Sequence, residues 1–189
     1  SIVSPSHRCG VTGLRPTFGS VSRYGAMCLA WSMDKVGPIC RTAEDAALVF
    51  ASLLGYDPRD PGSIGRTFKY RSPKDLKGVK IGVLGSLDSE PAQCVAGLGA
   101  VVTPFKAPPT LPGSELIITV ESSAMFDRLT RSEQLALLTE NSWPRTFRQG
   151  RFVPAVEYVQ AERVRQTLKS LYQTAFAELD LVLAADTGA

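Results

Sequence analysis

Histidine is almost absent from this chain of 189 residues, and several other residue types are scarce. There is one histidine, His7, with two tryptophans and four cysteines. A single histidine leaves a Ser–His–Asp triad with only His7 as its base, and a zinc site with only one imidazole ligand. Because His7 lies in a segment rich in glycine and serine, we expect an exposed loop residue. The sequence argues against both kinds of site.

Common binding and catalytic motifs are absent too. The chain has no GxxxxGK[ST], GxGxxG, HExxH or GxSxG pattern, so we expect no cofactor and no metal. No apolar run reaches 18 residues, so the sequence predicts no membrane span. No signal peptide is visible, so the cytoplasm is the default location. The net charge of +3 is small and spread along the chain, so no basic stripe suggests nucleic acid as a partner.

The cysteines and lysines give little indication of chemistry. No C-x-x-C pair occurs among the cysteines, and we expect four reduced and mostly buried thiols: Cys9, Cys28, Cys40 and Cys94. No spacing marks any lysine as desolvated, and we expect solvated surface charges at Lys35, Lys69, Lys74, Lys77, Lys80, Lys106 and Lys169.

What is present is the composition of an ordinary globular chain. Apolar residues make up 44% and charged residues 21%, and the length favours one domain. The chain begins at Ser1 without methionine and ends in the loop-like sequence DTGA. These ends predict a piece of a larger domain, in which an unpaired sheet edge would favour aggregation.

The pattern of residues predicts alternating helices and strands. Residues 1–40 contain many glycines, serines and prolines, which predicts turns and short strands. Thr42 begins a helix that Gly55 ends, and a loop covers residues 56–73. Residues 79–84, 91–98 and 99–103 predict a strand, a helix and a strand, and therefore a parallel βαβ unit.

The second half is predicted to be mainly helical. Helices are expected over residues 114–129 and 132–138, the latter capped by Ser132, and an irregular basic segment over 145–151. Pro154 begins a long helix, and a last strand covers residues 180–184. The apolar stripe of the long helix has steps of three or four residues: Ala161, Val164, Leu168, Leu171, Ala175 and Leu179.

Several runs of residues resemble the amidase signature family. They are CGVTGLRPTFG at 9–19, VSRYG at 21–25, SMDKVGP at 32–38, RTAEDAA at 41–47, PAVEYVQA at 154–161 and DLVL at 180–183. Residues 9–47 carry the most specific part of the match. The resemblance implies an α/β fold, part of the mixed-sheet amidase signature fold with helices on both faces. It also implies that residues 1–189 form an incomplete amidase signature domain, with a Gly/Ser-rich active-site and core segment over 1–40 and a helix and strand remainder over 41–189.

The resemblance places Ser1 at the nucleophile of a Ser–cis-Ser–Lys triad. The lysine, the cis-serine and two glycines of the oxyanion hole precede this serine in the family, so an isolated piece is expected to be inactive. Val3 replaces an arginine that is usual in the family. Met125 and Phe126 are candidates for an acyl pocket or for plain core.

The implied function is hydrolysis of carbon–nitrogen bonds in small linear amides, without nucleic acid or membrane partners and with a possible homodimer. Two alternatives stay open: a non-catalytic or degenerate interaction domain on the amidase fold, and the glutaminase-type A subunit of a tRNA-dependent amidotransferase. The run ESSAMFDRL at 121–129 keeps only part of the glutaminase pattern, which favours a general amidase.

Arg163 and Arg165 are expected on a solvated, ion-paired helix face.

Overall fold

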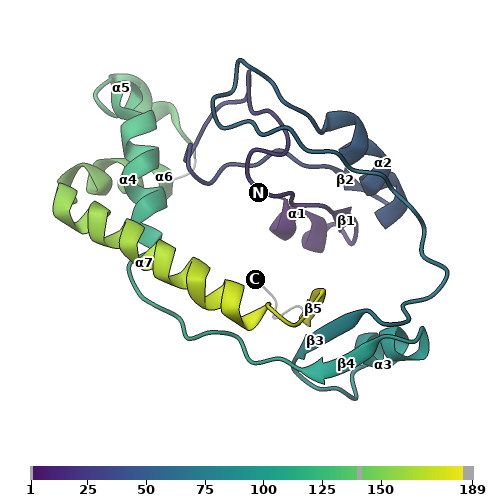
Figure 1. Cartoon of the computed structure of the whole chain (residues 1–189). Coiled ribbons are helices and arrows are strands. Elements are labelled where there is room, and N and C mark those ends of the chain that lie inside the picture. Colours follow the sequence, from purple (N-terminus) through teal and green to yellow (C-terminus); the bar gives the residue numbers. More distant parts are fainter. Residues whose placement is uncertain (1, 140–141, 185–189) are drawn as a thin grey trace. The chain divides into compact units, whose positions relative to one another are not determined.

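The computed structural model describes residues 2–139 and 142–184, and the chain forms two compact units (Figure 1). The first unit comprises Ser1–Ser72 and Ile117–Val153, and the second comprises Pro73–Leu116 and Pro154–Ala189. Within the described ranges, no helix combines the length and the apolar character that crossing a membrane requires. The chain contains helices with parallel and antiparallel sheets, so the predicted α/β class is confirmed.

The second unit contains the predicted βαβ arrangement. Strand β3 (Lys80–Leu84) leads through helix α3 (Glu90–Gly97) to strand β4 (Val101–Pro104), which pairs with β3 in parallel. Ile81 and Val83 on β3 are buried, as a central strand requires. Gly82 lies between them, and a Cβ there would come within 2.7 Å of Leu179 Cδ1 and 2.9 Å of Phe105 Cβ.

Helix α7 (Ala155–Ala175) and strand β5 (Leu181–Ala184) complete the second unit. Pro154 precedes α7 as predicted, and β5 pairs in parallel with β3, giving the strand order β4-β3-β5. The predicted apolar stripe is the less exposed face of α7, except that Leu171 is exposed and Leu179 lies beyond the end of the helix. Arg165 Nη2 lies 2.6 Å from Glu162 Oε2, which confirms the ion-paired face for this arginine.

The first unit begins with a helix that the sequence analysis missed. Residues 1–40 were predicted to form turns and short strands, but α1 (Val3–Arg8) is helical, followed by the antiparallel pair β1 (Thr12–Gly13) and β2 (Ile39–Cys40). Pro5 lies in the first turn of α1, where proline is tolerated. Gly13 lets β1 approach α1, because a Cβ there would clash with Ser6 Oγ and lie 2.9 Å from Ile2 Cγ2.

Helix α2 (Ala43–Leu53) follows the sequence prediction closely. The Thr42 side chain accepts a hydrogen bond of 3.0 Å from the backbone N–H of Asp45, which is the expected N-cap. Glu44 and Asp45 in the first turn complement the positive end of the helix dipole. Leu54 ends the helix one residue before Gly55.

The helices that return to the first unit differ from the prediction in three places. One helix was predicted over 114–129, but α4 (Glu115–Met125) breaks at Phe126 before α5 (Asp127–Thr130). Ser132 precedes the 3-10 helix η1 (Glu133–Leu137), but its hydroxyl donates backwards to the Leu129 carbonyl at 2.9 Å, so the predicted cap is wrong. The basic segment is not irregular, because α6 (Ser142–Gln149) and the 3-10 helix η2 (Gly150–Phe152) cover it.

The four cysteines are free, as expected, but they are less buried than predicted. Cys9 and Cys94 are exposed, and Cys28 and Cys40 are half-buried. The expectation of mostly buried thiols is therefore wrong. Cys9 follows α1 at the surface, and Cys94 lies on α3, where only Ala92 is buried.

Candidate functional site

Two neighbouring pockets of the first unit share one wall. The Ile2 pocket, of about 380 Å³, is lined by Ile2, Val3, Arg15, Leu29, Ala30, Met33, Asp34, Lys35 and Ile118. The Arg23 pocket, of about 460 Å³, is lined by Arg23, Tyr24, Ala26, Met27, Cys28, Leu29, Trp31, Asp34, Lys35, Val36, Arg59, Asp60 and Pro61. Leu29, Asp34 and Lys35 line both pockets. The segment that contains them, residues 23–36, therefore separates the two pockets, and we call it the wall segment.

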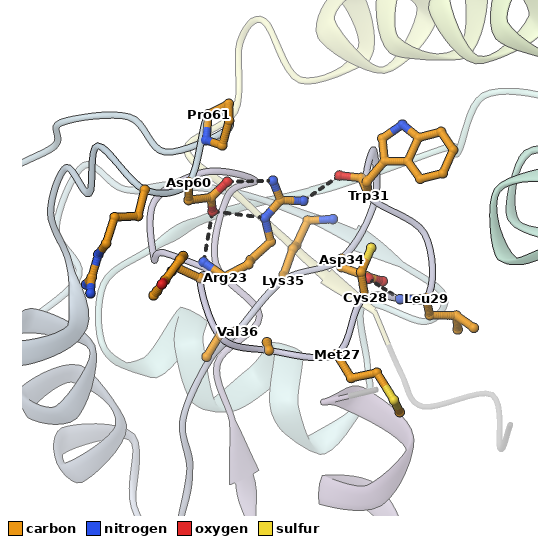
Figure 2. A pocket seen from close by; sticks show the side chains of 13 residues that line it. Arg23, Met27, Cys28, Leu29, Trp31, Asp34, Lys35, Val36, Asp60 and Pro61 are labelled. Carbon is orange, nitrogen blue, oxygen red and sulfur yellow. Dashed lines mark hydrogen bonds and ion pairs between the residues drawn. The ribbon is translucent and has the colours of Figure 1, made fainter. Parts of the chain in front are cut away.

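Arg23 holds the segment that forms this wall. Figure 2 shows its guanidinium between the Asp60 carboxylate and the Trp31 backbone carbonyl, to both of which it donates. Arg23 Nη2 lies 3.0 Å from Asp60 Oδ1, Nε lies 3.2 Å from Oδ2, and the Arg23 backbone N–H reaches the same Oδ2 at 2.8 Å. The guanidinium also lies over the Phe18 ring, 4.4 Å from its centroid. These contacts tie the wall segment to the loop that contains Asp60.

Asp60 is an ionised anchor for this network. Its side chain is buried, and the Gly62 backbone N–H donates to Oδ1 at 2.9 Å. The hydrogen bond from the Arg23 side chain, helped by the Arg23 backbone N–H, lowers the pKa of Asp60 to about 2. The carboxylate therefore stays charged, and paired, across the physiological pH range.

Asp34 fixes the backbone of the same segment through hydrogen bonds with Leu29 and Ala30. Its Oδ2 accepts hydrogen bonds from the backbone N–H groups of Leu29 at 2.7 Å and Ala30 at 3.0 Å. Burial, followed by a hydrogen bond to Asp34, raises the pKa of the Cys28 thiol to about 11. A thiol with this pKa is protonated at neutral pH, so Cys28 is a poor nucleophile.

Lys35 is the one lysine for which the surface prediction is wrong. The side chain is half-buried, and Nζ donates to the Met33 carbonyl at 2.8 Å. Burial lowers the pKa of Lys35, and the positive charge of Arg15 lowers it further. Figure 2 shows the Lys35 side chain beside Arg23, within the wall that both pockets share.

Glu121 supports the wall from helix α4. Its side chain is completely buried, and one carboxylate oxygen accepts a hydrogen bond of 3.1 Å from the backbone N–H of Ser32. The neighbouring Ser123 hydroxyl donates to the Thr119 carbonyl at 2.6 Å, and its Oγ lies 3.2 Å from the Thr146 carbonyl oxygen. The Glu-Ser-Ser run thus has a packing role in this chain, so its match to the glutaminase pattern does not identify a substrate.

The predicted site residues fall in different places. Ser1, the predicted nucleophile, lies outside the described residues, but Ile2 and Val3, which follow it in the chain, line the Ile2 pocket. Met125 and Phe126 line a separate hollow of about 510 Å³ near α5, and neither lines the Ile2 pocket. Phe126 also stacks on Phe147, with ring centroids 4.8 Å apart. His7 is exposed as expected, although it lies in α1 rather than in a loop.

Sequence reasoning missed the network around Arg23, Asp60 and Lys35. Charge alone did not distinguish these residues from solvated ones. Their place in the sequence could have indicated two of them, because Arg23 lies in the VSRYG run and Lys35 in the SMDKVGP run that resemble the family.

Comparisons with known proteins agree with the resemblance. A family profile described as Amidase matches residues 1–188. The A subunit of glutamyl-tRNA(Gln) amidotransferase from Pseudomonas savastanoi pv. phaseolicola (strain 1448A / Race 6) is 33% identical over 229 residues, which cover 99% of this chain and 47% of the relative. The alignment is longer than the chain itself (229 against 189 residues), so the relative carries about 40 residues in this region that the chain lacks.

Solved structures also match nearly the whole chain and less than half of their own length. The native peptide amidase from Stenotrophomonas maltophilia is 25% identical with a TM-score of 0.76, covering 100% of this chain and 47% of that one. A structure from a study of a vestigial protein complex and the evolutionary origins of an s-triazine catabolic enzyme is 28% identical with a TM-score of 0.78, covering 96% and 42%.

The chain spans about half the length of the curated relatives it matches. Within that span, the family profile covers nearly every residue, and the α/β fold matches that of solved family members. The chain therefore belongs to the amidase signature family of amide hydrolases.

Proposed function

We propose that the protein containing this chain hydrolyses carbon–nitrogen bonds of small linear amides through an acyl-enzyme on Ser1. The observation that carries this proposal is the match of the Amidase profile over residues 1–188, which includes Ser1. The Ile2 pocket supports it, because two of its lining residues directly follow Ser1 in the chain. We also propose a cytoplasmic location, since four free thiols are typical of a reducing compartment.

The proposed reaction has two steps. The Ser1 hydroxyl attacks the amide carbonyl while its proton passes through a second serine to a base. The C–N bond then breaks as that proton goes to the leaving amine, and water hydrolyses the acyl-serine ester to release the acid and restore the hydroxyl. The resemblance implies a lysine as the base and backbone N–H groups of two glycines as the oxyanion hole. In the family pattern these groups precede the nucleophile, so catalysis is assigned to the whole protein.

The test is ammonia release from a panel of linear amides by the full-length protein. We expect turnover in the wild type and a loss of at least about 1,000-fold in Ser1→Ala, as in other serine hydrolases that lose their nucleophile. An acyl adduct on the peptide containing Ser1, found by mass spectrometry, is the direct evidence. Absence of turnover with every amide would favour a non-catalytic interaction domain on the same fold.

Met125 and Phe126 remain proposed acyl contacts, and the same panel tests them. If they contact the acyl group, Met125→Ala changes the preference for acyl chain length without changing the rate on the shortest amide. Met125 is the better probe, because it is exposed whereas Phe126 is stacked on Phe147. An unchanged preference would leave the hollow near α5 without a role in catalysis.

We propose further that the isolated 189-residue chain is inactive. A serine hydroxyl without its base and oxyanion donors is a weak nucleophile. The measurement is amide hydrolysis by the purified chain. Turnover that disappears with Ser1→Ala in the isolated chain would contradict this proposal.

A second candidate is a glutaminase-type component of an amidotransferase, which the name of the Pseudomonas relative favours. Comparing glutamine with simple amides as substrates of the full-length protein separates the two. A strong preference for glutamine would support the amidotransferase component, and efficient turnover of simple amides would support the general amidase.

A further inference from the structure

The Ile2 pocket contains more positive than negative charge. Arg15 and Lys35 line it, and Asp34 is its only acidic lining residue within the described part of the chain. The remaining lining residues are all apolar: Ile2, Val3, Leu29, Ala30, Met33 and Ile118. A single uncompensated positive charge therefore faces an otherwise apolar hollow.

The nearby acids are already engaged. Asp34 Oδ2 accepts hydrogen bonds from the backbone N–H groups of Leu29 and Ala30. Asp60, on the far side of the wall, is held by Arg23 through side-chain and backbone hydrogen bonds. Among the described residues, no ion pair to Lys35 Nζ is formed, and the negative charge of Asp34 only partly offsets the lowering of the Lys35 pKa.

Lys35 has capacity to bind a ligand. An ammonium group carries three N–H donors, and Lys35 uses one of them on the Met33 carbonyl. The side chain is partly withdrawn from water and lies near Arg15, and both conditions destabilise its charge, as the lowered pKa indicates. An anion in the pocket would relieve this cost, because it would compensate both cations at once.

We propose that the Ile2 pocket binds a carboxylate group of the substrate through Lys35 and Arg15, so that the preferred substrates are amides bearing one carboxylate. This inference rests on the proposed amidase function. One excess positive charge matches a singly charged anion, and a volume of about 380 Å³ with apolar walls accommodates a short aliphatic chain between the carboxylate and the amide. Lys35 is in this view a specificity-determining residue.

The experiment compares matched pairs of amides with the full-length enzyme. One pair is the half-amide of a short dicarboxylic acid and the neutral amide of equal length. The other is an N-acyl amino acid and its decarboxylated counterpart, so the two pairs distinguish a carboxylate on the acyl side from one on the amine side. We expect the wild type to prefer the charged member of one pair by about tenfold or more in kcat/KM, the size of one charge-assisted contact.

Lys35→Met should abolish this preference by lowering kcat/KM on the charged member about tenfold or more relative to the neutral member of the same pair, and Lys35→Arg should restore much of it. Lys77→Met is the matched control, because Lys77 is 81% exposed and its ion pair with Asp75 lies on the surface. An equal loss on charged and neutral substrates in Lys35→Met would assign Lys35 a structural role and overturn the inference, as would a wild type without preference in either pair.

A binding measurement separates failure of this inference from failure of the proposed function. Calorimetric titration of the full-length protein with butyrate and valerate, which carry one carboxylate each, needs no turnover. Binding that Lys35→Met removes and Lys77→Met keeps supports the carboxylate site even if Ser1 is not a nucleophile. Turnover of neutral amides without any dependence of monocarboxylate binding on Lys35 overturns the site and leaves the amidase proposal intact.

Discussion

Arg23 connects three parts of the first unit through one guanidinium group. It contacts the Asp60 carboxylate, the Trp31 carbonyl and the Phe18 ring. The Arg23 and Asp60 side chains are only 16% and 5% exposed, so neither is fully hydrated. A buried charge that loses its partner is strongly destabilising, and this pair should therefore contribute more than an exposed ion pair does.

Removing the charge of Asp60 should destabilise the protein. We expect Asp60→Asn to lower the free energy of unfolding at pH 7 by about 3 kcal/mol, because Arg23 then loses its compensating carboxylate. Asp75→Asn is the control, since the Asp75 side chain is 52% exposed and its pair with Lys77 spans 3.9 Å. Urea denaturation measures both variants, and an equal small effect would show that Arg23 does not depend on Asp60.

The same pair predicts a dependence of stability on pH. The pKa of Asp60 is about 2 in the folded chain and about 3.9 in an unfolded one. Its contribution is therefore complete above about pH 4 and is lost as the pH falls toward 2. The difference in unfolding free energy between wild type and Asp60→Asn should shrink over that range, and a difference that stays constant down to pH 2 would contradict this assignment.

The residues of the candidate site were only partly predictable from sequence. The family motifs indicated Ser1 and the segment 32–38, because these runs are specific. They did not indicate that Lys35 is half-buried or that Asp60 belongs to the same network, since Asp60 is 37 residues from Arg23 in the chain. Such pairings depend on loop geometry, which has no periodic pattern to reveal it.

At the scale of elements, the second unit has a central strand with a close contact on Gly82. We expect Gly82→Ala to destabilise the protein by about 2 kcal/mol, since the new methyl group would overpack against Leu179 and Phe105. Gly97→Ala is a control in the same unit, because Gly97 ends α3 with no atom within 4 Å of an added Cβ. It should be neutral or stabilise by up to about 0.5 kcal/mol, as a helical glycine replaced by alanine does. Thermal unfolding compares the two, and equal shifts would rule out crowding at Gly82.

Elements with strong local signals were predictable, and those defined by packing were not. The Thr42 cap, the proline before α7 and the βαβ order each have a local cause, and the structure contains all three. Helices α1 and α6 were missed, because Pro5 and Pro144 weaken their helical patterns. Burial of Ser6 in α1 and Phe147 in α6 shows that tertiary contacts stabilise them instead.

At the scale of the whole molecule, the three-stranded sheet has two edges. Within the described residues β5 pairs only with β3, and Leu181 on β5 is 54% exposed. An exposed apolar edge strand is a template for pairing with another chain. We expect the isolated chain to associate as its concentration rises, and Leu181→Lys to reduce this association in sedimentation velocity experiments.

Leu137→Lys is the control for the edge prediction, because Leu137 is 78% exposed on η1, which is not part of a sheet. It removes an exposed leucine and adds the same charge without changing a sheet edge. Equal reductions by the two substitutions would indicate a general effect of charge rather than edge pairing.

The anchoring of the wall segment has a consequence for how this protein can evolve. Arg23, Trp31 and Asp34 are fixed by backbone and side-chain hydrogen bonds, whereas Met27 between them is 83% exposed. The conformation of the segment therefore depends on its anchors and not on the Met27 side chain. Mutation can alter Met27, which lines the Arg23 pocket, while the fold keeps its stability, so selection can change the chemistry of the pocket in single steps.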